Sequence, residues 1–158
     1  MIVLLDQNLV LLATPKTGTT ALEAALAPHA SMVVSNPPAL KHTSLQTYKR
    51  FVQPYLCHVS NETPQTAALI RHPLHWLDSW YRCRGRPWLD GKPNSTAKMS
   101  YSAFIEAYLQ DNRPSFANVG TQANMITDAD NATVDHLFKY ENINKYVVFL
   151  EGKLKTTL

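Results

Sequence analysis

The chain of 158 residues is poor in cysteine, glycine and long apolar runs, and each shortage excludes a class of protein. Its two cysteines, Cys57 and Cys83, cannot make a disulfide framework or a metal centre. No apolar stretch reaches the length of a membrane span, because Asp6, Gln7 and Asn8 interrupt the one at the N-terminus. We therefore expect neither a cysteine-stapled scaffold nor a membrane partner.

The charge balance is mild. Lysine and arginine outnumber the acidic residues 15 to 12, which gives a formal net charge of +3 and a pI near 8.9. This suits a protein that handles anionic ligands, but it is too weak to indicate a nucleic-acid partner. The length predicts a single domain over 1–158. Because the N-terminal segment lacks the basic start and cleavage site of a signal peptide, we expect a cytoplasmic protein, or a catalytic domain from something longer.

Apolar periodicity and turn residues predict strands that alternate with helices. The expected strands are 9–14, 31–35, 67–70 and 133–140. The expected helices are 18–27, 43–53, 74–84, 100–109 and a last one from Asn142, with loops at 36–39 and 85–98. Pro54 is expected to stop or kink the helix over 43–53. The alternation predicts a three-layer α/β fold, with a mostly parallel central sheet flanked by helices.

The most informative segment is Lys16-Thr17-Gly18-Thr19-Thr20, which links the first expected strand to the first expected helix. The start of a helix offers unpaired N–H groups and the positive end of a dipole. Lys16 adds a full charge, the threonines add hydroxyl groups, and Gly18 permits a close backbone approach. The segment predicts a cradle for a phosphate or sulfate group, the other reading being an ordinary threonine-capped helix start. It is not the common nucleotide-triphosphate loop, because its lysine precedes its only glycine.

A second anion site is predicted near Arg71. This residue directly follows the strand over 67–70, and Ser79 lies about two helical turns further on. A guanidinium group can pair with two phosphate oxygens at once. Because ligands bind beyond the carboxyl ends of parallel strands, Arg71 and Lys16 are expected at the same edge of the sheet. The alternative is that Arg71 pairs with a surface carboxylate while Ser79 only packs.

Both segments resemble those of one enzyme family. The run Pro-Lys-Thr-Gly-Thr-Thr from Pro15 resembles the 5′-phosphosulfate loop of sulfotransferases that use 3′-phosphoadenosine 5′-phosphosulfate (PAPS), and among them the carbohydrate-type branch. The second segment resembles the 3′-phosphate-binding segment of that family, although Trp76 stands where members often carry a second arginine. The matching residues there are Arg71, Pro73, Ser79 and Tyr81.

The resemblance implies a fold like that of the P-loop-containing nucleotide hydrolases, and a sulfuryl transfer from PAPS that needs no metal. The acceptor would be a hydroxyl or amine of a carbohydrate or small molecule. The 5′-phosphosulfate would be held by Lys16, Thr17, Gly18, Thr19 and Thr20. The 3′-phosphate would be held by Arg71 and Ser79. Lys16 would also stabilise the charge that develops during transfer.

The resemblance further implies that His42 is the general base, because many members carry a lysine and a histidine in a stretch like Lys41-His42. An imidazole titrates near neutrality and can take a hydroxyl proton. The alternative is a solvent-facing histidine at a helix start.

Three other functions stay open. Family members continue past the last helix, whereas this chain ends at Leu158, so a degenerate sulfotransferase that only binds nucleotide is one alternative. A small kinase is another, and would need an acidic magnesium ligand beside the loop. The third is a non-catalytic module for sulfated glycans that uses Arg82, Arg84, Arg86 and Lys92. The sequence indicates neither the acceptor nor the oligomeric state.

Overall fold

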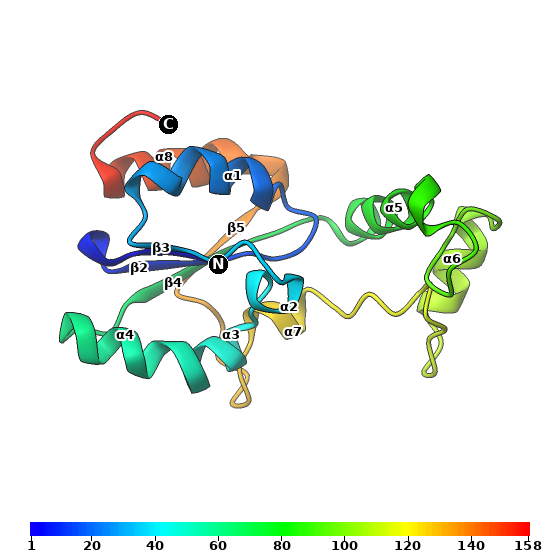
Figure 1. Cartoon of the computed structure of the whole chain (residues 1–158), viewed down its shortest axis with the longest axis horizontal. Coiled ribbons are helices and arrows are strands. Elements are labelled where there is room, and N and C mark those ends of the chain that lie inside the picture. Colours follow the sequence, from blue (N-terminus) through cyan, green and yellow to red (C-terminus); the bar gives the residue numbers. More distant parts are fainter. The chain divides into compact units, whose positions relative to one another are not determined.

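The computed structural model describes all residues, 1–158, and divides into two compact units (Figure 1). Unit 1 comprises Met1–Arg71 and Thr121–Leu158, and unit 2 comprises His72–Gly120. Unit 1 contains the whole β-sheet, whereas unit 2 is helical. Each unit has its own buried apolar cluster.

The sheet of unit 1 has five strands in the order β3-β1-β2-β4-β5. The strands are β1 (Ile2–Leu4), β2 (Leu9–Leu12), β3 (Met32–Val33), β4 (Gln65–Ile70) and β5 (His136–Lys139). The β2, β4 and β5 strands run parallel, whereas β1 pairs antiparallel with both β2 and β3. The fold is therefore α/β with a mixed sheet that is parallel on the β2-β4-β5 side, and the predicted strand over 31–35 shortens to two residues.

The β1 strand was not predicted, and it explains the polar residues that interrupt the N-terminal apolar segment. Asp6 and Gln7 belong to a single turn of 3-10 helix, η1 (Leu5–Gln7), and Asn8 follows it in the left-handed conformation with φ 49°. Asn tolerates this conformation better than most residues. The turn joins β1 to β2 as a hairpin, so the apolar segment supplies two buried strands instead of one.

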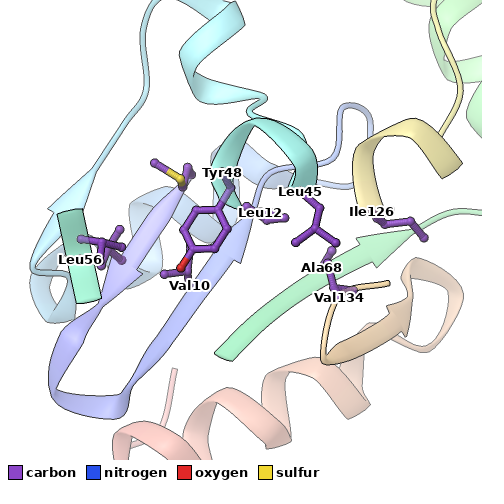
Figure 2. Close-up of a cluster of buried hydrophobic side chains, with 10 residues drawn as sticks. Val10, Leu12, Leu45, Tyr48, Leu56, Ala68, Ile126 and Val134 are labelled. Carbon is purple, nitrogen blue, oxygen red and sulfur yellow. The ribbon is translucent and has the colours of Figure 1, made fainter. Parts of the chain in front are cut away.

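Helices cover both faces of this sheet (Figure 1). The elements of unit 1 outside the sheet are α1 (Thr19–Leu26), η2 (Ala27–His29), α2 (Pro38–Lys41), α3 (Leu45–Thr47), the π-helical η3 (Tyr48–Val52), α4 (Gln53–Ser60), α7 (Ala123–Ile126), η5 (Tyr140–Asn142) and α8 (Ile143–Leu154). Side chains of a strand alternate between faces, so Leu9 and Leu11 join the cluster under α1 and α8. Val10 and Leu12 join the opposite cluster, where Figure 2 shows them with Leu45, Tyr48 and Ala68.

The helix predicted over 43–53 extends further than expected, to Ser60. Its start is capped by Ser44, whose Oγ accepts a hydrogen bond from the Thr47 N–H at 3.3 Å. Pro54 does not end the helical segment. It lies in the first turn of α4, where the N–H group that proline lacks would have no hydrogen-bond partner within the helix. The departure from α-helical geometry lies just before Pro54, in the π-helical stretch η3.

Unit 2 consists of helices around aromatic side chains. They are α5 (Pro73–Arg84), η4 (Pro87–Leu89) and α6 (Tyr101–Tyr108). Trp76, Leu77 and Phe104 are buried in its core. Ser100 caps α6, since its Oγ accepts from the Ala103 N–H at 3.2 Å. The η4 turn interrupts the expected loop over 85–98.

The remaining predicted elements exist with shifted ends. The strand predicted over 133–140 narrows to β5, and α2 forms inside the loop expected over 36–39 because Pro38 occupies its first turn. The last predicted helix is α8. None of the helices has the length and apolar content needed to cross a membrane.

Candidate functional site

The loop between β2 and α1 makes a tight turn. Lys16 has φ 69° and Gly18 has φ 74°, so two left-handed residues flank Thr17. Thr17 is fully buried, and its hydroxyl donates to the Thr14 carbonyl at 2.8 Å. A positive φ is uncommon for lysine and costs free energy, and such residues concentrate at functional sites.

The loop ends at the start of α1, with Gly18 as its N-cap residue. The first N–H groups of a helix have no partner within it, and here they belong to Thr19 and Thr20. The Thr17 hydroxyl hydrogen is engaged inside the loop, so Thr19 and Thr20 are the loop threonines whose hydroxyl groups can donate to an anion. This geometry can bind an anion, as the sequence predicts.

Arg71 lies beside this loop. It follows the last residue of β4, whose parallel neighbour β2 leads into the loop, so both segments lie at the carboxyl edge of the sheet. The Arg71 Nη1 donates to the Lys16 carbonyl at 3.4 Å. The Arg71 Nε is buried and has no hydrogen-bond partner. A buried charged group without its full set of partners is costly, which indicates a group that completes it.

Tyr140 fills the space between these two segments. Its ring lies 4.9 Å from the Arg71 guanidinium carbon, in a cation–π contact. Its Cε2 would be 3.2 Å from a Cβ atom at Gly18. Three segments far apart in the sequence therefore converge within unit 1: the loop, the end of β4 and the end of β5.

We expect Gly18→Ala to lower the free energy of unfolding by more than about 1–2 kcal/mol, because strain of an L-residue at positive φ alone costs roughly that amount. The new methyl group would also press on Tyr140. The matched control is Gly91→Ala, since Gly91 has φ 73° and no atom within 4 Å of an added Cβ. Chemical denaturation measures both. An effect of Gly18→Ala no larger than that of Gly91→Ala would contradict a packed contact with Tyr140.

His42 contacts the residues that lead into the loop. It follows α2, and its Nδ1 is 2.6 Å from the Ala13 carbonyl oxygen. A carbonyl only accepts, so Nδ1 carries the hydrogen and Nε2 carries the lone pair of the neutral ring. Burial lowers the pKa of His42, the hydrogen bond to Ala13 opposes this, and the charge of Lys41 lowers it further. The side chain is half-buried at the end of α2 and not at a helix start.

The ion pair between Lys41 and Glu23 was not predicted from the sequence. The Lys41 Nζ donates to the Glu23 carboxylate at 2.9 Å and to the Thr20 hydroxyl at 3.3 Å. Both side chains are largely buried. The sequence does indicate that Glu23 and Thr20 share one face of α1, because they are three residues apart on the helix. The pair ties the segment that carries His42 to the first turn of α1.

Ser79 lies in unit 2, on α5, and is half-buried. Lys16, His42 and Arg71 belong to unit 1. The structure thus brings together three predicted site segments in one unit, and the joint action of Arg71 and Ser79 on one phosphate stays a prediction. Trp76, which stands where members of the resembled family often carry a second arginine, is a core residue of unit 2.

Two of the basic residues considered for glycan binding have structural partners in unit 2. Arg82 pairs with Asp78 at 2.7 Å, one helical turn away. Arg84 donates to the Ser115 and Asn118 carbonyls, the latter at 3.0 Å. No group of three or more His, Cys, Asp or Glu side chains in the chain is placed to hold a metal ion.

Comparison of the chain with family models, with curated proteins and with solved structures finds no match. The geometry of the residues is therefore the basis for assigning a function.

Proposed function

We propose that the protein is a sulfotransferase that moves a sulfuryl group from PAPS to a hydroxyl or amine of a carbohydrate or small molecule. The observation that carries the proposal is the contact between Arg71 and the Lys16 carbonyl. It joins two cationic segments, 55 positions apart, at one edge of the sheet. The donor has anionic groups on the 5′ and the 3′ oxygen of its ribose, and this edge offers a cation for each.

The residues present fit such a donor. Lys16 and the N–H groups of Thr19 and Thr20 would bind the 5′-phosphosulfate, and Arg71 would bind the 3′-phosphate, with Ser79 of unit 2 as its predicted second ligand. The unpartnered Nε of Arg71 is a donor suited to a phosphate oxygen. The order of strand, loop and helix, followed by a parallel strand, supports a fold like that of the P-loop-containing nucleotide hydrolases.

The chain's own residues would assist the reaction in two ways. PAPS supplies the sulfuryl group when it is bound. Lys16 and the fixed N–H groups of the loop favour negative charge on the donor side, and they need no rearrangement to do so. The His42 Nε2 accepts the proton of the acceptor, because Nδ1 is held by Ala13.

We expect the acid limb of the rate profile to lie below pH 6.5, the ordinary pKa of histidine. Burial lowers the pKa of His42, so the ring stays neutral at pH 7. Its Nε2 is protonated, and can no longer act as a base, only at lower pH. The rate should be flat near neutrality and fall as the pH drops through the lowered pKa. Steady-state rates from pH 5 to 8 measure this, and a limb centred above 6.5 would contradict His42 as the base.

The test of the proposal is turnover of PAPS without added metal, in the presence of carbohydrate and phenolic acceptors. Formation of 3′-phosphoadenosine 5′-phosphate together with sulfated acceptor, lost in Lys16→Ala, would support it. Consumption of ATP that requires Mg²⁺ would instead favour the kinase. Binding of sulfated glycans with no response to PAPS would favour the non-catalytic module.

A further inference from the structure

The main chain of Arg71 is held by one side chain, that of Gln122. The Arg71 N–H donates to the Gln122 Oε1 at 2.7 Å, and the Gln122 Nε2 donates to the Arg71 carbonyl at 2.7 Å. The last recorded pair between β4 and β5 is Ile70 with Lys139. The amide therefore gives Arg71 the two hydrogen bonds that another strand residue would give, one position beyond the end of the ladder.

The side chain of Gln122 does not cap the helix that follows it. Gln122 stands at the N-cap position of α7, but its side chain makes no cap hydrogen bond. Glutamine is not among the preferred cap residues. Thr121 supplies that function, since its Oγ1 accepts from the Asn124 N–H at 3.2 Å. The Gln122 amide is thereby left for Arg71.

The short helix α7, next to Gln122, is packed into the core of unit 1. Ile126, on α7, is buried in the cluster that includes Leu45, Ala68 and Val134, as Figure 2 shows. Position 127 pairs with position 133 in an isolated bridge. Gln122 is thus fixed to the same core that holds β4.

We propose that Gln122 is a positioning residue that fixes Arg71 so that its guanidinium faces the anionic ligand. Without the two amide hydrogen bonds, the residue after Ile70 gains freedom in φ and ψ, and the guanidinium leaves the Lys16 carbonyl and the Tyr140 ring. The inference rests on the proposed function, because it assigns Arg71 to the 3′-phosphate of the donor. Gln122 itself touches no ligand in this account.

The experiment compares Gln122→Met, Gln122→Asn and the matched control Asn124→Ala. Methionine has similar length but neither hydrogen bond, and asparagine keeps the amide on a side chain too short to reach. Asn124 is exposed on the same short helix. Calorimetric titration with 3′-phosphoadenosine 5′-phosphate and with AMP should show affinity for the first falling about tenfold in both Gln122 variants. The affinity for AMP should stay within about twofold, a split that a general loss of structure would not produce.

A second readout follows Arg71 directly. The buried Nε–H of Arg71 should give a protected side-chain resonance in a ¹H–¹⁵N spectrum, identified by its loss in Arg71→Lys. The resonance should broaden or vanish in both Gln122 variants and persist in Asn124→Ala. An unchanged Arg71 resonance in the Gln122 variants would overturn the inference. So would an unchanged affinity of these variants for 3′-phosphoadenosine 5′-phosphate, provided that the wild type prefers this nucleotide to AMP. If the wild type shows no such preference, the proposed function fails, and the resonance alone decides whether Gln122 positions Arg71.

Discussion

Lys16→Ala is expected to weaken the use of PAPS by about 10- to 150-fold in kcat/KM. The substitution removes a charge-assisted hydrogen bond to the phosphosulfate, worth about 1.5–3 kcal/mol, and each 1.4 kcal/mol is about a factor of ten. The effect should reach turnover as well as binding, because charge at the loop favours the reacting state. Steady-state kinetics with varied PAPS measure both quantities.

The control for Lys16→Ala is Lys145→Ala, which removes an exposed lysine from α8 in the same unit. It lowers the net charge equally, so any general electrostatic effect on an anionic substrate appears in both variants. Arg71→Ala should cause a loss like that of Lys16→Ala, through the 3′-phosphate of the nucleotide. Wild-type kinetics in both Lys16→Ala and Arg71→Ala would refute the donor site.

His42→Ala is expected to lower turnover by about 10²- to 10⁴-fold, the usual contribution of a general base. The affinity for donor nucleotide should stay near that of the wild type, because the recorded partner of the imidazole is the Ala13 carbonyl. Single-turnover rates at saturating PAPS and acceptor measure the loss, and calorimetry measures the donor affinity.

His29→Ala is the matched control for the base, since His29 is exposed on η2 in the same unit. It should leave turnover unchanged. A His42→Ala variant that keeps full activity would remove His42 from the mechanism. A variant that loses donor affinity together with activity would make the residue part of the binding site instead.

The local parts of this fold could be predicted from the sequence because they depend on short-range patterns. The strand before Lys16, the helix after Gly18 and the strand that ends before Arg71 all follow from apolar runs and helix-start signals. Parallel strands place their carboxyl ends at one edge. The proximity of Lys16 and Arg71 was therefore predictable, and the 3.4 Å contact bears it out.

The parts that could not be predicted depend on tertiary contacts. The β1 strand has only three residues, and it is stable because β2 and β3 pair with its two edges. Gln122 and Arg71 are 51 positions apart, and nothing local marks a glutamine that binds a main chain rather than water. The burial of Lys41 with Glu23 likewise arises only when α2 packs near α1.

The most direct test of the donor site is calorimetric titration of the metal-free wild type with 3′-phosphoadenosine 5′-phosphate, with AMP as the comparison. We predict a preference of about tenfold or more for the 3′-phosphorylated nucleotide, roughly 1.4 kcal/mol, and its loss in Arg71→Ala. Equal binding of the two nucleotides, or no binding of either, would contradict the assignment of Lys16 and Arg71 to a PAPS site.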